Sequence, residues 1–406
     1  MVLGTAAYLT RAKEGSLPLI YLNNISTTTK KPPQVTEAVI KAMTTMGNAS
    51  RGTHGSALEA SRVLYDTRRK LADFFGCSRA DHVIFTSGGT EALNIAINGI
   101  AKPNSHILVS SHESETVLTI LNHIQANYDW TIDFFSAEQD GTIDISALSE
   151  KLCPQTCAII CSPASSLTGI RIDLKTLGNY AHEHGLLFLA DATWTAGFCP
   201  VHMEHDNIDI LCFSGHRGLM GPQGTGGLCI RPGTDIRPLK VGGSGVQSYS
   251  KTHPLEYPAR LEAGTLNSHG IAGLSAALDF LLKIGPESIY QHQQALMKLF
   301  IHNAASLNHV NLWNSVSSAS RLPMISLSVD GLDSETLART LMEQHGIAVD
   351  YIPNRIPRPE QMQGTNNSDT VQFSFSWFNT KEEIEQAIAV LQKIYHFMEE
   401  SKWQTM

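Results

Sequence analysis

Short apolar segments alternate with segments of helical periodicity through residues 82–230, and this alternation restricts the fold more than any other feature. Most of the expected strands are apolar along their whole length, which is typical of strands buried on both faces of a sheet. The expected strands are 82–87, 106–111, 131–135, 157–161, 186–190 and 210–213, with a further apolar run ending at Ile230. We therefore expect an α/β fold with a mixed, mostly parallel sheet between helices.

The pattern changes after Gly243, where an irregular connection leads into a region of mixed helices and strands. Helices are expected at 271–284, 289–307, 334–345 and 381–398, and strands at 324–329, 347–349 and 371–377. This pattern predicts a smaller α+β domain. Because 406 residues are too many for one simple core, we expect a large domain of residues 30–270 and a small domain of residues 1–29 and 271–406.

Polar residues and glycines directly follow several of the expected strands. Gly89 and Thr90 open a helix after strand 82–87, Asp191 follows strand 186–190, and residues 214–217 follow strand 210–213. In α/β folds, ligands bind at the carboxyl ends of the strands. A glycine-rich turn before a helix lets backbone amides approach an anion, so the first of these turns predicts a phosphate site. It is not a Walker loop, because no Gly-Lys-Ser/Thr follows.

The charge of the chain and its apolar runs exclude some kinds of partner. The formal net charge is −8 and no basic stripe is present, which argues against nucleic acid. No apolar run reaches the roughly 18 residues needed to span a bilayer. Residues 1–18 lack the basic start and apolar core of a signal peptide. We therefore expect a cytoplasmic protein with no membrane partner.

The cysteines and histidines favour structural positions over metal sites. Seven cysteines, an odd number in a long chain, indicate reduced thiols. Cys153, Cys157 and Cys161 recur every four residues, but they run into an apolar strand, where cysteine is a common small core residue. The pairs His182/His184 and His202/His205 have no third ligand at a suggestive spacing, so we interpret them as surface histidines.

Six segments together resemble the cysteine desulfurases, members of the class V aminotransferases. One is Ser214-Gly-His-Arg-Gly218, which is similar to the family's Ser-Gly-His-Lys-Gly. The others are 21–28 (YLNNISTT), 85–94 (FTSGGTEALN), 164–169 (ASSLTG), 260–267 (RLEAGTLN) and 373–380 (FSFSWFNT). The resemblance covers nearly the whole chain. It implies a type I pyridoxal phosphate fold, usually found as a homodimer.

The resemblance also implies which residues surround the cofactor. It places the cofactor phosphate at Gly89, Thr90, Ser214 and His216, and the pyridine nitrogen at Asp191. Thr265 corresponds to a threonine that one subunit contributes to the phosphate site of its neighbour. Because these positions match together, the sequence predicts a retained pocket for a small anionic or phosphorylated ligand.

The sequence departs from the family at the reacting end of this pocket. Arg217 stands where the family has the lysine that bonds the cofactor. A buried lysine can lose its proton, whereas a guanidinium stays charged at physiological pH. Further departures are Ser114 for the ring-stacking histidine, Ser166 for an asparagine, Trp194 for a glutamine, Gln372 for the carboxylate-binding arginine and Arg355 for the sulfur-accepting cysteine. No cysteine follows Cys229.

These departures predict a non-catalytic homologue that binds a partner or a small ligand. They make pyridoxal phosphate a doubtful ligand, bound non-covalently at most. The alternative is a repurposed enzyme, a non-standard lyase or transferase that uses the old pocket. Its candidate acid–base residues are His54, His112, Glu113, Glu115 and His216. A third hypothesis is pairing with an active desulfurase or another sulfur-transfer protein, in which Thr265 completes the partner's phosphate site.

Overall fold

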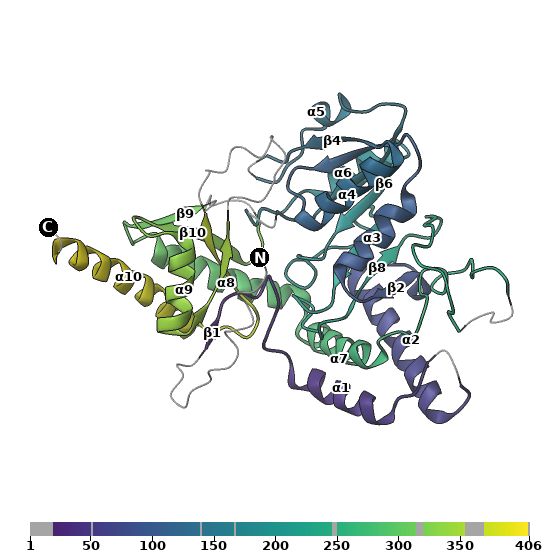
Figure 1. Cartoon of the computed structure of the whole chain (residues 1–406), viewed down its shortest axis with the longest axis horizontal. Coiled ribbons are helices and arrows are strands. Elements are labelled where there is room, and N and C mark those ends of the chain that lie inside the picture. The colour runs from purple at the N-terminus through teal and green to yellow at the C-terminus, as the bar shows by residue number, and fades with distance from the viewer. Residues whose placement is uncertain are drawn as a thin grey trace.

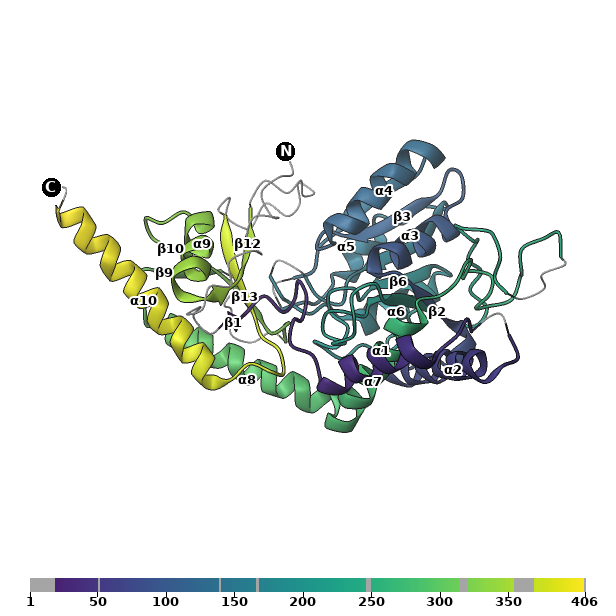
Figure 2. The same cartoon turned by 60° about the horizontal axis from the view of Figure 1, so that its bottom comes forward.

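The computed structural model describes residues 19–49, 52–138, 140–165, 168–245, 250–313, 320–353 and 369–404. These residues form a larger and a smaller lobe, which lie side by side in Figure 1. The larger lobe contains a seven-stranded sheet and the smaller lobe a four-stranded sheet. In Figure 2, helix α7 (Ser268–Ile284) lies under the larger lobe, and α8 (Pro286–Ala304) continues from it toward the smaller lobe.

The seven-stranded sheet has the order β2-β8-β7-β6-β5-β3-β4. Its strands are β2 (Val83–Thr86), β3 (His106–Ser110), β4 (Thr131–Phe135), β5 (Thr156–Cys161), β6 (Leu187–Asp191), β7 (Ile210–Ser214) and β8 (Gly226–Ile230). Only β8 is antiparallel to its neighbours in this sheet. The other strands therefore end at one common edge, and this edge brings the polar residues that follow β2, β6 and β7 together.

Helices cover both faces of this sheet, as the apolar strands predict. They are α1 (Pro33–Thr45), α2 (Gly55–Phe75), α3 (Gly89–Ile100), α4 (Glu115–Tyr128), α5 (Ile145–Ser149) and α6 (Leu174–Glu183), with the short 3₁₀ helix η2 (Ala80–His82) before β2. Along β7, Leu211 and Phe213 pack in one core with α2, α6 and α7, while Cys212 packs in the other with α3 and α4. The sheet is thus buried on both faces.

The smaller lobe is an antiparallel sheet of order β12-β13-β10-β9 with helices beside it. Its strands are β9 (Val310–Trp313), β10 (Met324–Val329), β12 (Asp350–Ile352) and β13 (Thr370–Ser374), and its helices are α8, α9 (Ser334–His345) and α10 (Lys381–Gln404). The short strands β1 (Ile20–Tyr21) and β11 (Ile347–Ala348) pair in parallel. Phe300, Phe373 and Phe375 form the centre of its core.

The predicted fold class is confirmed, with a mixed and mostly parallel sheet between helices and a smaller α+β lobe. Helix α5 begins at Ile145, because the side chain of Asp144 caps the helix by accepting from the backbone amides of Ser146 and Ala147. The strands β9 and β12 were not expected. Each has fewer than five residues, so its position depends on the neighbouring strand more than on its own pattern.

The domain boundaries stay a prediction. In the structure, Leu274 and Leu278 of α7 pack in the core of the larger lobe, whereas Phe300 of α8 packs in the smaller core. Residues 354–368, between β12 and β13, lie outside the described residues. Among the helices that the structure describes, none is both long and apolar enough to cross a bilayer.

Candidate functional site

A cavity of about 340 Å³ opens at the edge where β2, β6 and β7 end. Its size is in the range of small-ligand sites. It is lined by Ser87, Gly88, Gly89, Thr90, Glu91, Leu93, Thr116, Thr193, Trp194, Ser214, His216, Arg217, Gln223 and Gly224. Five of the seven predicted site residues line this cavity: Gly89, Thr90, Ser214, His216 and Arg217. Asp191 and Thr265 do not line it.

One wall of the cavity is the amino-terminal end of α3, which begins at Gly89. A Cβ atom on Gly89 would lie 2.4 Å from Cγ2 of Thr193 and 2.5 Å from Oγ of Ser214. Only glycine therefore fits between these side chains. The backbone amide of Ser87 donates to Glu91 at 2.7 Å, and the free amides of the first helical turn carry a partial positive charge. This wall can bind an anion.

Ser214 and His216 line the cavity at the end of β7. Nδ1 of His216 lies 3.0 Å from Oγ1 of Thr27. Burial lowers the pKa of His216 to about 4, with the charges of Arg217 and Lys31 acting in the same direction. The imidazole is therefore neutral at neutral pH. It can donate or accept a hydrogen bond, depending on its tautomer, but it adds no positive charge.

Residues 27–31 hold this turn in place from the amino-terminal segment. The hydroxyl of Thr28 donates to the carbonyl of Arg217 at 2.8 Å. Nζ of Lys31 donates to the carbonyl of Gly221 at 2.7 Å, and burial lowers its pKa to about 8. The position of the turn thus depends on a segment that is remote in sequence.

Arg217 packs against Trp194, with its guanidinium carbon 3.7 Å from the centroid of the indole ring. Nε and Nη1 are buried and have no hydrogen-bond partner among the described residues. Burial lowers the pKa of Arg217 to about 10, partly offset by Asp191 and Asp350. The side chain therefore remains protonated at neutral pH. Asp191 acts on Arg217 electrostatically, and no ion pair within 4 Å joins the two in the described structure.

Asp191 is fully buried beneath the cavity. One carboxylate oxygen accepts from the amide of Thr193 at 2.9 Å and the other from the hydroxyl of Ser114 at 3.1 Å. Ser114 also caps α4 by accepting from Val117 at 3.4 Å. Burial raises the pKa of Asp191 above its usual value. These contacts hold the carboxylate in one orientation at the end of β6.

Glu113 is a second buried carboxyl beside Asp191. It accepts from the backbone amide and, at 2.8 Å, from the hydroxyl of Ser162. Burial, together with the charge of Asp191, raises its pKa to about 8. Two carboxylates this deeply buried cannot both be charged at low cost. Glu113 therefore carries the proton of the pair at neutral pH.

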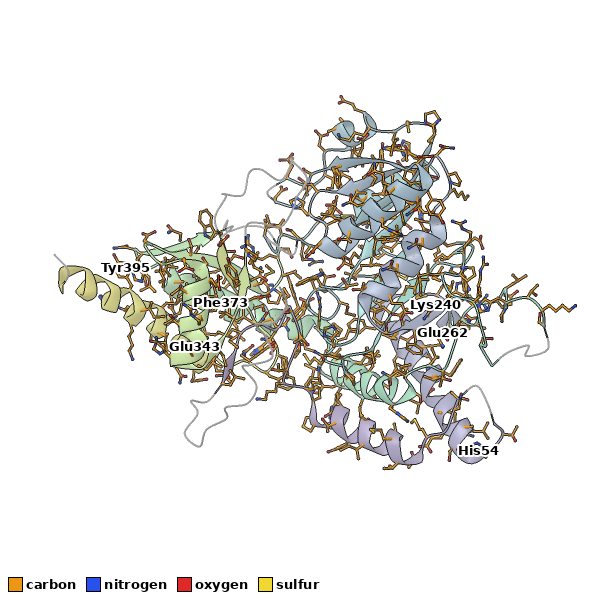
Figure 3. All side chains as sticks on the ribbon, in the orientation of Figure 1. His54, Lys240, Glu262, Glu343, Phe373 and Tyr395 are labelled. Atoms are coloured by element: carbon orange, nitrogen blue, oxygen red, sulfur yellow. The ribbon has the colours of Figure 1, made fainter. Side chains whose placement is uncertain are left out.

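The remaining acid–base candidates do not converge on the cavity. His54 precedes α2 at the outer end of that helix, where Figure 3 labels it. Glu115 is exposed in the first turn of α4. His112 is largely buried, which lowers its pKa. Of the five candidates, only His216 lines the cavity, while Glu113 is a buried acid on which the charge of Asp191 acts.

Several other expected positions lie away from the cavity. Thr265 is exposed, and its hydroxyl accepts from Nδ2 of Asn48 at 3.4 Å. Gln372 is buried in β13 and donates to Ser326 at 3.4 Å. Ser166 and Arg355 lie outside the described residues. Neither Thr265 nor Gln372 therefore contributes to the wall of the cavity within this chain.

The structure describes no group of three or more metal-binding side chains in the parts of the chain that it covers. His182 pairs with Asp209 and His205 with Asp206. His184 contacts the carbonyl of Tyr180. All seven cysteines are free thiols. The histidine pairs thus have protein partners.

The residues at or near the cavity that were not singled out from the sequence include Thr116, Thr193, Gln223 and Asp350. Thr193 could have been found from its place two residues after Asp191, whose carboxylate it orients. Thr116 and Gln223 line the cavity. Asp350 belongs to β12 of the smaller lobe and acts on Arg217 electrostatically. No local pattern marks these three positions, since each depends on how distant segments pack.

Comparison with known proteins gives consistent matches over most of the chain. The family model described as Aminotransferase class-V matches residues 20–387. A probable cysteine desulfurase of Methanothermobacter thermautotrophicus is 28% identical over 387 residues, which cover 92% of this chain and 94% of the relative. The apo structure of a cysteine desulfurase from Thermococcus onnurineus NA1 has a TM-score of 0.84 at 26% identity, covering 93% of this chain and 94% of the other.

A third match bears on the cofactor. A lysine-to-alanine mutant of C-DES with glycine covalently linked to its PLP cofactor has a TM-score of 0.79 at 22% identity, covering 92% of this chain and 96% of the other. The expectation that pyridoxal phosphate is a doubtful ligand is wrong in view of these matches, because relatives and structural neighbours are cysteine desulfurases and one is seen with this cofactor.

Proposed function

Because the chain belongs to the class V aminotransferase family and is a cysteine desulfurase-like protein, we propose that it binds pyridoxal phosphate but does not desulfurate cysteine. The main support is Arg217, a charged side chain in the cavity wall that is packed against Trp194. A guanidinium keeps its proton at neutral pH, so it cannot supply the free amine of a lysine. The protein then acts through ligand or partner binding.

The residues in the cavity wall and the buried Asp191 behind it suit the two ends of this cofactor. Gly89 leaves no room for a Cβ atom, so a phosphate can approach the amides at the start of α3, next to Thr90 and Ser214. Asp191 is a buried carboxylate that can accept a hydrogen bond from a protonated ring nitrogen. His216, which is neutral, can bond the phosphate without changing the charge of the site.

The buried carboxyl pair sets the charge beneath the ring. Glu113 holds a proton at neutral pH because its pKa is raised to about 8. Asp191 then keeps its negative charge, which Arg217 favours. When bound, pyridoxal phosphate supplies a ring that withdraws electrons from groups attached to its aldehyde carbon. Asp191 would hold the proton on the ring nitrogen, and Trp194 would cover the cavity beside Arg217.

Desulfuration would need a positive charge that binds the substrate carboxylate and a reactive thiol that accepts the sulfur. Gln372 is neutral and hydrogen-bonded to Ser326, so it offers no positive charge to a substrate carboxylate. No cysteine occurs after Cys229, and Cys212 and Cys229 are fully buried, which raises the pKa of both thiols. A buried thiol with a raised pKa is a poor nucleophile.

Calorimetric titration with pyridoxal phosphate and with pyridoxal tests the proposal. We expect the phosphate ester to bind at least about tenfold more tightly than pyridoxal, because only the ester reaches the amides of α3. With L-cysteine added, sulfide should form no faster than with free cofactor, and a cysteine desulfurase assayed in parallel serves as the positive control. Equal affinity for the two compounds, or sulfide release far above the background, would contradict the proposal.

We further propose that the chain acts as a dimer in which Thr265 completes the phosphate site of the partner. Thr265 is exposed and lies outside the cavity of its own chain. The partner is a second copy or an active desulfurase. Light scattering separates a monomer from a dimer, and mass spectrometry of the complex isolated from cells identifies the second subunit. A monomer whose affinity for pyridoxal phosphate is unchanged by Thr265→Ala would rule the dimer out.

A further inference from the structure

Arg217 is a cation in the wall of the cavity, where Asp191 and Asp350 act on it only over a distance. Its Nε and Nη1 are buried without a hydrogen-bond partner in the described part of the chain. None of the ion pairs that the structure shows within 4 Å includes it. Burying charged donors without partners is unfavourable. An acceptor supplied by a ligand would remove this penalty.

The phosphate of the proposed cofactor does not need Arg217. The start of α3, Thr90 and Ser214 already provide backbone and hydroxyl donors. Arg217 instead lies on the indole of Trp194. The cavity thus contains two sets of donors for anions, and a single phosphate group uses one of them.

The groups that face Arg217 leave its donors available. The oxygens of Asp191 accept from Thr193 and Ser114, and one oxygen of Asp350 accepts from the amide of Tyr351 at 3.1 Å. Both acids act on Arg217 over a distance. His216 is neutral at neutral pH, and Lys31 donates to backbone carbonyls. The charges of Asp191 and Asp350 weaken the attraction of Arg217 for an anion, but their oxygens do not accept from its hydrogen-bond donors.

We propose that Arg217 binds the carboxylate of an amino acid that is joined through its nitrogen to pyridoxal phosphate. This inference rests on the proposed function and names the ligand class of the same site: a phosphopyridoxyl amino acid, with a phosphate and a carboxylate. The planar guanidinium matches a carboxylate with two parallel hydrogen bonds. Rotation about the side-chain bonds of Arg217 moves the donors off the indole and into the cavity.

Two stable ligands and three variants test this proposal. N-phosphopyridoxyl glycine carries the carboxylate, and N-phosphopyridoxyl methylamine is the same molecule without it. Their affinities are measured by calorimetry for the wild-type protein and for Arg217→Gln, with Arg79→Gln as the control. Arg79 is an exposed arginine paired with Asp81, away from the cavity.

We expect the wild-type protein and Arg79→Gln to bind the glycine compound at least about tenfold more tightly than the methylamine compound. Arg217→Gln should bind both compounds with similar affinity, near the wild-type affinity for the methylamine compound. The fluorescence of Trp194, isolated by comparison with Trp194→Phe, should change more with the glycine compound. A merely structural role of Arg217 would weaken both ligands equally.

The outcomes separate this inference from the function on which it rests. Tight binding of both compounds by the wild-type protein, with no difference between them, would overturn the role of Arg217 and leave the cofactor site intact. Binding of neither compound, nor of pyridoxal phosphate, would overturn the proposed function itself. A preference for the glycine compound that survives in Arg217→Gln would place the carboxylate on another group and also overturn the inference.

Discussion

The guanidinium carbon of Arg217 lies 3.7 Å from the centre of the Trp194 ring, and both residues line the cavity. A cation over an indole face is attracted by the ring, with a typical gain of about 0.5–2 kcal/mol. The contact holds in place a side chain whose Nε and Nη1 lack other partners in the described structure. It also places a permanent positive charge where a neutral amine would be needed for a bond to an aldehyde.

Replacing this arginine with lysine should create an amine that bonds the cofactor. Arg217→Lys, incubated with pyridoxal phosphate and then with borohydride, should gain a phosphopyridoxyl group at residue 217, because burial lowers the pKa of a lysine and frees its amine. Peptide mapping by mass spectrometry locates the group. Arg217→Gln is the matched control, and it also reveals any reaction at Lys31, whose pKa is lowered to about 8. An unmodified residue 217 in the lysine variant would contradict our placement of the cofactor aldehyde.

A side chain at Gly89 should disrupt the anion site. In Gly89→Ala the new Cβ would lie 2.4 Å from Thr193 and 2.5 Å from Ser214, so we expect a loss of about 1–3 kcal/mol in the free energy of unfolding. Binding of pyridoxal phosphate should fall as well. Gly55→Ala is the matched control, since Gly55 opens α2 and a Cβ there meets no atom within 4 Å. Urea unfolding and calorimetry measure the two effects, and normal cofactor binding by Gly89→Ala would exclude a role for this turn.

Stability should depend on pH through Glu113. Its pKa is raised from 4.5 to about 8 in the folded protein, so between these values the folded state holds a proton that the unfolded state has lost. This contribution to the free energy of unfolding is complete below about pH 4.5 and is lost as pH rises toward about 8, by at most about 1.4 kcal/mol per unit.

Comparison with Glu113→Gln isolates this dependence. His216, whose pKa is lowered to about 4, contributes in the opposite direction, losing stability as pH falls below its unfolded value. Because both proteins share His216, the stability of the wild type relative to Glu113→Gln should fall as pH rises. Urea unfolding at several pH values gives this difference, and a constant or rising difference would show that Glu113 is charged in the folded protein.

The buried pair Arg68–Glu262 should contribute strongly to the stability of the larger lobe, where Figure 3 labels Glu262. The two side chains are 2.6 Å apart, and Glu262 also accepts from the amide of Phe85 at 2.7 Å. Glu262→Gln should cost about 3–5 kcal/mol, because it leaves the charge of Arg68 buried and uncompensated.

An exposed acid-to-amide change provides the comparison for Glu262. Asp279, which pairs with Lys70 at 2.7 Å, is 60% exposed. Asp279→Asn should therefore cost less than about 1 kcal/mol, since water screens the pair. Both values come from urea unfolding under the same conditions. Similar losses for the two variants would mean that water reaches Arg68 in the folded protein.

The positions of the candidate site residues along the chain could be predicted because they follow strands. Apolar runs end at Thr86, Asp191 and Ser214, and the common direction of these strands brings their ends to one edge of the sheet. The turn at Gly89 was recognisable for the same reason. A strand such as β9 was missed, since a short edge strand is stabilised by its neighbour β10 rather than by its own pattern.

The sequence by itself determined the fold class, the edge that holds the cavity and the permanent charge at residue 217, because these depend on local periodicity and on side-chain chemistry. Only the tertiary structure decided which groups meet. Arg217 packs on Trp194 instead of pairing with Asp191, and Glu113 joins Asp191 in a buried pair. Such contacts join residues from separate segments. Their distances and burial arise from the packing of whole elements, which no local pattern contains.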